Sequence, residues 1–276
     1  MTIIEARKAS LLFRVKQFGG PLNEPAILAQ FLAQAMHESG GLRYVREIWG
    51  PTKAQRGYEG RKDLGNTQPG DGKRFMGRDV IQVTGRANYR ALSKWAGFDF
   101  EAKPEALESP EWLGIGAIWY FLAARKDLIK YCREGNIEMV TRRVNGGLNG
   151  YQDRLRWYDD CALKLLGFDT VRDFQKSAGL VVDGISGPKT RAALHEALSH
   201  VRKTPETVTR PAPHVNATPA KRPAQSAKPA APPSPAKEAG KALAGGAVGA
   251  LAVLAAYAGD AWAKFTAFCD YITFWN

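Results

Sequence analysis

Residues 25–39 are the stretch that most constrains the fold, because their apolar pattern suits only a helix packed into a core. Large apolar residues recur every three or four positions, which is the spacing of one buried helical face. They are Ile27, Leu28, Phe31, Leu32, Ala35 and Met36. Pro25 suits a first helical turn, Asn23 is the expected N-cap, and Gly40-Gly41 is a stop signal. A core built around this helix is therefore expected.

Glu38 closes this helix on or beside the apolar face. Burial disfavours the charged form of a carboxyl group, so a raised pKa is expected for Glu38. A second carboxylate, Glu47, follows within an aromatic and basic stretch, residues 43–49. Acid/base cleavage of a glycosidic bond needs one protonated acid and one ionised base. The pair predicts such a site, although a lone glutamate in a last turn usually faces solvent.

Several separated motifs resemble the catalytic domain of glycoside hydrolase family 19, the family of chitinases and of related phage and bacterial muralytic lysozymes. They lie at residues 37–41, 45–47, 77–89, 144–147 and 153–154. The resemblance implies a mainly α, bilobal, lysozyme-like catalytic domain with a central cleft. Apolar periodicity in residues 110–124 and 152–166 agrees with further helices.

The resemblance also implies roles for single residues. Glu38 would be the general acid and Glu47 the general base, with Glu59 as the second choice for the base. Thr84 would help to hold the attacking water. The remaining matched positions would line the cleft or support the two acids: Gln82, Asn88, Asn145 and Arg154. The family is inverting, so the two carboxyl groups should stand roughly 6.5–9.5 Å apart around a water. No metal or other cofactor is expected, because the acidic residues lack ligand spacing with histidine.

Each supporting residue also has a purely structural interpretation. Asn145 suits a turn, Thr84 suits a strand, Arg154 suits a buried ion pair, and His37 is expected to be structural. The pattern departs from the family in two ways. The gap between the acids is much shorter than in plant chitinases, as in the lysozyme-like variant. Asp79 stands where glycine is common, which predicts a changed backbone beside the cleft.

Residues 50–73 form a long, polar, glycine-rich stretch that predicts a loop. Long loops in compact domains are usually disordered or functional, and the position of this one between Glu47 and residues 77–89 indicates a cleft wall. Trp49, Tyr58 and Phe75 are candidates for stacking on sugar rings, with core packing as the alternative.

One medium domain followed by three appended segments is expected along the 276 residues. Residues 1–166 form the catalytic domain, and residues 167–200 resemble the second half of a peptidoglycan-binding module, with a hairpin that binds nothing as the alternative. Residues 201–240, rich in Pro, Ala and Lys, form a linker. Residues 241–276 form a membrane-associating helical tail, with an apolar helix and then an aromatic face. A soluble helical hairpin packed on the catalytic domain is the alternative for this tail.

The net charge of +12 favours anionic partners, and without a nucleic-acid motif the cell envelope is preferred over nucleic acid. Three isolated cysteines indicate synthesis in a reducing cytoplasm, and residues 1–18 do not resemble a signal peptide. These features predict a monomeric phage or prophage endolysin, which reaches the wall after the membrane fails and hydrolyses β-1,4 bonds of peptidoglycan. Chitin is the rival substrate. A non-catalytic wall-binding or membrane-disrupting protein is the rival of another class.

Overall fold

A computed structural model describes residues 2–201. These residues are helical and contain no strand longer than isolated β-bridges, so the expectation of a mainly α protein is confirmed. The predicted tail, residues 241–276, and the linker from residue 202 onward lie outside the described residues. Within residues 2–201 no helix has the length and apolar character needed to cross a bilayer. The helices in chain order are α1 (Ile3–Phe18), η1 (Gly20–Asn23), α2 (Pro25–Glu38), α3 (Lys53–Arg56), η2 (Lys62–Leu64), α4 (Asp71–Arg74), α5 (Arg86–Ala96), η3 (Pro104–Glu108), α6 (Ile115–Trp119), η4 (Tyr120–Ala124), α7 (Asp127–Arg133), α8 (Ile137–Asn145), α9 (Tyr151–Leu166), α10 (Val171–Ser177) and α11 (Pro188–His200).

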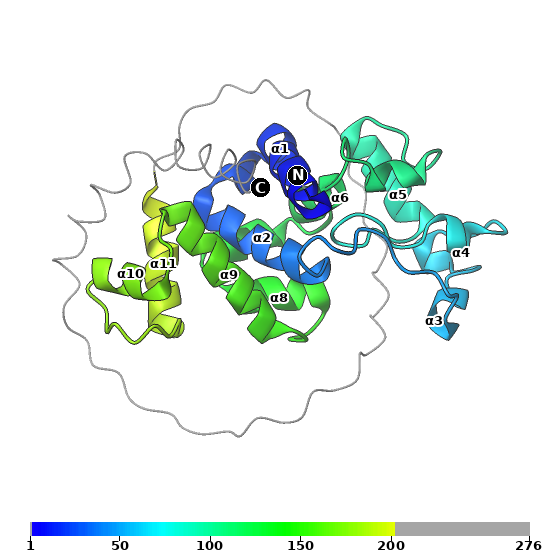
Figure 1. Cartoon of the computed structure of the whole chain (residues 1–276). Coiled ribbons are helices and arrows are strands. Elements are labelled where there is room, and N and C mark those ends of the chain that lie inside the picture. The colour runs from blue at the N-terminus through cyan, green and yellow to red at the C-terminus, as the bar shows by residue number, and fades with distance from the viewer. Residues whose placement is uncertain (1, 202–276) are drawn as a thin grey trace.

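Helix α2 is the centre of the core, as its periodicity predicts. Every residue from Ala26 to Met36 is buried, and α2 packs along α9 with α7, α8 and α11 also in contact (Figure 1). The predicted cap at Asn23 is wrong. Asn23 ends the 3-10 turn η1, and Glu24 takes the N-cap position without a side-chain cap, followed by Pro25 at the first helical position.

The predicted helix over residues 110–124 forms in only part of that range. A turn precedes Gly114, which has a φ of +93°, and α6 then continues into a one-turn π-helix, η4. The apolar residues of the turn still pack into the core. Periodicity reports burial there, but it does not reveal the glycine-dependent break.

Residues 50–73 are not a structureless loop, because α3, η2 and the start of α4 interrupt them. The Glu59 carboxylate accepts hydrogen bonds from the backbone N–H groups of Gly70 and Gly72, at 2.7 and 2.8 Å. The Asn66 side chain donates to the carbonyl of Tyr58 and accepts from the N–H of Arg86. These contacts fix the segment against α5. Figure 1 shows α3, α4 and α5 gathered on one side, away from the α2–α9 pair.

Helices α10 and α11 pack directly on the catalytic helices. A four-residue turn after Leu166 joins α9 to α10, and α11 contacts both α9 and α2. His195 of α11 bonds through Nε2 to the carbonyl of Arg133, and Arg191 pairs with Asp159 of α9 at 3.2 Å. The proposed boundary near residue 166 therefore separates two units in close contact.

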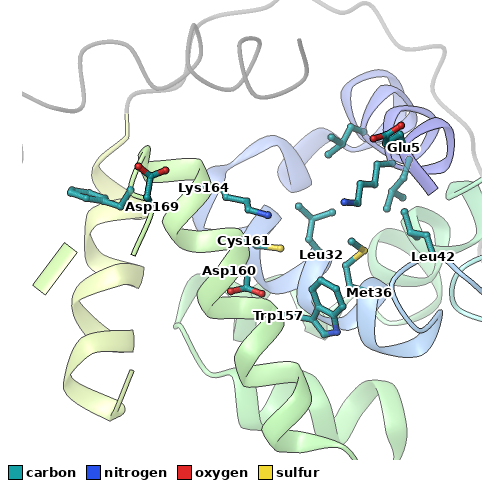
Figure 2. A pocket seen from close by; sticks show the side chains of 13 residues that line it. Glu5, Leu32, Met36, Leu42, Trp157, Asp160, Cys161, Lys164 and Asp169 are labelled. Carbon is teal, nitrogen blue, oxygen red and sulfur yellow. The ribbon is translucent and has the colours of Figure 1, made fainter. Parts of the chain in front are cut away.

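A groove of about 500 Å³ lies between α1, α2 and α9 (Figure 2). Its floor is apolar, with Leu32, Met36 and Trp157 among its residues, and its rim carries charges such as Lys164. Residues 32 and 36 lie on the face of α2 opposite residues 34 and 38, because two helical positions correspond to about 200°. None of the predicted catalytic or substrate-binding residues lines this groove.

Candidate active site

The motif at residues 37–41 ends α2 with a tight left-handed turn. Gly40, Gly41 and Leu42 have φ values of +59°, +71° and +65°. Three such residues in succession favour glycine, which has no Cβ to clash. The buried Ser39 hydroxyl donates to the Ala35 carbonyl and accepts from the N–H of Leu42, which closes the turn. The turn therefore holds the last residue of α2, Glu38, in a fixed place.

Glu38 forms a buried ion pair with Arg154 in the first turns of α9. The Arg154 Nη2 to Glu38 Oε1 distance is 2.7 Å, and the two side chains are 1% and 2% exposed. The same guanidinium also donates to the side-chain oxygen of Gln34 and to the carbonyl of Asn149. Burial favours the neutral form of Glu38 and Arg154 favours its carboxylate form, so two opposing effects set its protonation. The raised pKa of Glu38 stays a prediction.

His37 has the structural role expected of it. Its Nδ1 lies 2.6 Å from Asp153 Oδ2, so it ties the end of α2 to the start of α9 beside Arg154. The pKa of Asp153 is lowered: burial acts to raise it, but the contacts with His37 and Arg156 outweigh burial. The pair at residues 153–154 therefore anchors the end of α2 at two points.

Glu47 is half-buried and is held by three hydrogen-bond donors. Its Oε1 accepts from Gln55 Nε2 and from the Tyr58 hydroxyl, each at 3.1 Å, and its Oε2 accepts from the Gly77 N–H at 3.1 Å. The Glu47 N–H in turn donates to the Gly77 carbonyl at 2.8 Å. The three donors therefore fix the Glu47 carboxylate in one orientation.

Gly77 brings Glu47 together with Thr84 and Gln82. A Cβ at residue 77 would lie 2.6 Å from Gln82 Oε1 and 3.3 Å from Thr84 Oγ1, so a larger residue there would require the Gln82 side chain to move. The Thr84 hydroxyl donates to the Gln82 carbonyl at 3.0 Å, and the Gln82 amide donates to the Asp79 carbonyl. Isolated bridges between Arg46 and Arg78 and between Arg78 and Val83 align the three segments. Thr84 therefore lies in a bridged turn and not in a regular strand.

Asp79 keeps the backbone conformation that glycine favours, with φ at +66°. The expected change of backbone relative to the family stays a prediction. Its buried carboxylate accepts from the N–H groups of Gly114 at 2.5 Å and Ala117 at 2.9 Å at the start of α6. Burial raises the pKa of Asp79 to about 6, against these backbone hydrogen bonds. The side chain thus ties residues 77–89 to the core.

Asn88 and Asn145 each carry a buried polar atom without a hydrogen-bond partner in the described part of the chain. Asn88 donates to the Thr84 carbonyl at 2.8 Å, and its Oδ1 has no partner. Asn145 ends α8 before the left-handed Gly146, and its Nδ2 has no partner. Since buried amide atoms normally find partners, both are available to a ligand or a water.

The aromatic candidates and Glu59 differ in their surroundings. Phe75 is fully buried against Tyr89 and belongs to the core. Trp49 and Tyr58 are half-buried, and their ring centroids lie 6.2 Å apart beside Glu47. Glu59 holds two backbone N–H groups, which is a structural role. Gln55 is not among the predicted site residues, although Thr52 and residue 55 form a capping-box pattern that marks the start of a helix.

The contacts that place Glu38 and those that place Glu47 come from different elements of the fold. Glu38 depends on α2 and α9, and Glu47 depends on α3 and the turn at Gly77. Across residues 2–201 no group of three or more His, Cys, Asp or Glu side chains is placed to hold a metal ion. The arrangement offers two carboxyl groups in unlike surroundings, which suits acid/base chemistry.

Comparisons with known proteins agree with the motifs. A glycosyl hydrolase family 19 domain-containing protein of Haemophilus influenzae is 34% identical over 159 residues, which cover 47% of this chain and 76% of that protein. An endochitinase of Arabidopsis thaliana is 33% identical over 145 residues, covering 50% of this chain and 48% of the plant protein. The chain thus spans about half the length of that plant relative.

Two further matches concern the second unit and the solved structures. Residues 168–194 match the model of a peptidoglycan binding domain. The crystal structure of chitinase C from Streptomyces griseus aligns with a TM-score of 0.47 at 21% identity, over 58% of this chain and 69% of that one. The likeness to the Haemophilus protein covers most of that protein at more than 30% identity. The chain is therefore a member of glycosyl hydrolase family 19, a glycoside hydrolase of the lysozyme or chitinase type that carries a peptidoglycan-binding domain.

Proposed function

We propose that the protein hydrolyses β-1,4 glycosidic bonds of peptidoglycan by a single displacement. Glu38 gives its proton to the leaving oxygen as the glycosidic bond breaks. Glu47 takes a proton from the attacking water as the new carbon–oxygen bond forms, with the Thr84 hydroxyl helping to orient that water. The observation that carries the proposal is the contrast between the two carboxyl groups: Glu38 is buried against one cation, and Glu47 is half-buried among neutral donors.

The supporting residues have roles that follow from their contacts. Arg154 positions Glu38 and balances its charge. Gln82 and Thr84 flank Gly77 beside Glu47. Asn88 and Asn145 offer unpartnered buried amide atoms to a sugar or to water. An inverting reaction needs room for a water between the two carboxyl groups.

The test combines two isosteric variants with product analysis. Glu38→Gln and Glu47→Gln should each lower the rate on sacculi by at least about a hundredfold, since each removes one proton-transfer group. Thermal melting shows whether the variants fold. NMR of the fresh product should show the α-anomer, as expected for inversion of a β-linkage. Full activity of either variant, or a β-anomer product, would count against the mechanism. Lysis by Glu38→Gln at the wild-type rate would favour the non-catalytic alternative.

Peptidoglycan is favoured over chitin by the wall-binding match at residues 168–194. Chitin is the second candidate, because the plant relative is an endochitinase. Turnover of purified sacculi and of chitin under the same conditions separates the two substrates. Mass analysis of the reducing ends released from sacculi identifies the linkage that is cut. Faster turnover of chitin than of sacculi would reverse the assignment.

An exposed apolar loop in the second unit supports wall binding. Val181, Val182 and Ile185 are 80%, 45% and 68% exposed, although apolar residues of this size usually bury most of their surface. The Gln175 amide, which bonds to Asp183, Thr190 and the Ile185 carbonyl, holds the loop in shape. Val181→Asp with Ile185→Asp should weaken co-sedimentation with sacculi and leave the melting temperature nearly unchanged. Unchanged co-sedimentation would remove this loop from the wall-binding surface.

The proposal has four further parts: a role in lysis of a host cell, synthesis in the cytoplasm, a monomeric state, and membrane association of residues 241–276. The wall-binding match and the net charge of +12 support a target in the cell envelope. A chain cut after Lys203 should keep hydrolysis of sacculi and lose binding to vesicles of anionic lipid. Equal vesicle binding by the cut and the full chain would contradict the membrane-associating tail.

A further inference from the structure

Gln55 has an orientation that its neighbours determine completely. Its side chain is buried, and its Oε1 accepts from the backbone N–H groups of Gly50 at 3.1 Å and Thr52 at 2.8 Å. Because a backbone N–H can only donate, the amide oxygen must be the atom that faces these two groups. The amide nitrogen is thereby turned toward Glu47 Oε1 and the Ile48 carbonyl, which both accept.

The Tyr58 hydroxyl completes the surroundings of the same oxygen. It donates to Glu47 Oε1 at 3.1 Å, and the Asn66 amide holds the Tyr58 carbonyl at 2.9 Å. A carboxylate oxygen has two lone pairs. Gln55 and Tyr58 therefore occupy both acceptor positions of Oε1.

The other carboxylate oxygen is only half occupied. Glu47 Oε2 accepts one bond within residues 2–201, from the Gly77 N–H, and Gly77 adjoins Thr84 Oγ1 and Gln82 Oε1. One lone pair of Oε2 remains, on the atom that bonds to Gly77. A water can donate a hydrogen bond to that lone pair.

From this arrangement we infer that Gln55 and Tyr58 are positioning residues, which fix Glu47 through Oε1 and leave Oε2 as the atom that takes the proton from water. The inference rests on the proposed function, in which Glu47 is the base. It also gives residues 50–73 a role beyond that of a cleft wall, because α3 and the following turn supply both donors. The loop contacts of Glu59 and Asn66 hold those donors in place.

The charged groups around Glu47 define what the test must leave unchanged. Tyr58 is the titratable side chain that contacts it, and Arg61 interacts electrostatically with that tyrosine. Arg46 and Arg78 flank it on the bridged segments, and both pair with Glu108, at 3.4 and 2.7 Å. The variants below alter none of these arginines.

Two variants remove one donor each. Tyr58→Phe deletes only the hydroxyl, and Gln55→Met replaces the amide by an apolar group of similar length. Thr52→Ala is the matched control, because it removes the cap of α3 at the Gln55 N–H but keeps both donors to Glu47. Initial rates on sacculi between about pH 3 and pH 9 give kcat and KM for the full chain, with the melting temperature measured alongside.

Each donor variant should lower kcat at the wild-type optimum about tenfold, roughly the effect of losing one hydrogen bond to a charged group. KM should stay nearly unchanged, since the base is displaced and not the substrate. Thr52→Ala should lower the melting temperature and leave kcat nearly unchanged. The inference fails if both donor variants keep the wild-type kcat, or if Thr52→Ala lowers kcat equally. An active Glu47→Gln would instead overturn the proposed function.

Discussion

Replacement of Arg154 by Met tests the buried ion pair most directly. The change removes the cation from a pair whose side chains are 1% and 2% exposed, and it leaves the Glu38 carboxylate in the core. It also leaves the Gln34 side-chain oxygen and the Asn149 carbonyl without this donor. Breaking a buried pair by removing one partner costs about 3–5 kcal/mol. For a folded unit of this size, that lowers the melting temperature by roughly 6–20 °C.

The loss should depend on pH and on Glu38. Protonation of Glu38 at lower pH removes the uncompensated charge, so the loss of unfolding free energy should be smaller at pH 5 than at pH 7. Adding Glu38→Gln to Arg154→Met should restore part of the stability at pH 7, because no buried charge remains. Both effects are read from urea unfolding followed by circular dichroism, as a double-mutant cycle.

Arg156→Met is the matched control on the same helix. Arg156 is 77% exposed and pairs with Asp153 at the surface, so its loss should change the unfolding free energy by less than about 1 kcal/mol. If Arg154→Met costs no more than Arg156→Met at pH 7, the buried ion pair does not stabilise the fold more than a surface pair does. A double variant no more stable than Arg154→Met alone would contradict an uncompensated buried charge on Glu38.

Three further changes test other parts of the structure. Gly85→Ala should destabilise the protein by at least about 1 kcal/mol, because φ is +92° and the new Cβ would lie 2.7 Å from the Leu64 carbonyl oxygen. The control Gly97→Ala meets no atom within 4 Å and should cost less in the same thermal melts. The pKa of Asp79 is raised from 3.8 to about 6, so its contribution to stability is largest below about pH 4 and is lost as pH rises toward 6. The unfolding free energy of wild type relative to Asp79→Asn should therefore fall over that range in urea titrations. A difference that does not change with pH would contradict this prediction. Burial raises the pKa of Asp159 to about 6 and Arg191 opposes that rise, so Asp159 pairs with Arg191 as a carboxylate at pH 7 and is largely neutral at pH 5. Arg191→Met should therefore destabilise the contact between α9 and α11 more at pH 7 than at pH 5. Limited proteolysis at the two pH values would detect the difference.

Periodicity was a good guide wherever burial of a long helix decides the structure. It predicts α2 within one residue of its end and α9 from its second residue onward, because both bury a continuous apolar face. It fails for residues 50–73, where four-residue helices are held by contacts such as Glu59 with two glycine N–H groups. Contacts of this kind join residues far apart in the chain, and no local pattern encodes them.

The site was predictable as a set of motifs but not as a geometry. The family resemblance assigns Arg154 to the network of the two acids, and the ion pair with Glu38 agrees with that assignment. The three donors around Glu47 come from α3, Tyr58 and Gly77, and only the folded chain brings them to one carboxylate. Asp79 departs from the family pattern, and the contact of its carboxylate with the Gly114 N–H is visible only in the folded chain.

The short joint between α9 and α10 has a mechanical consequence. Because α11 contacts α9 and α2, the exposed loop at residues 181–185 has little freedom to move relative to the helix that carries Glu38. If this loop binds the polymer, as proposed, the distance along the polymer between the bound site and the cleaved bond is nearly constant. The enzyme must then dissociate before it cuts elsewhere, so its fragments should have a preferred minimum length. An enzyme whose binding domain is attached by a long flexible linker should show no such preference.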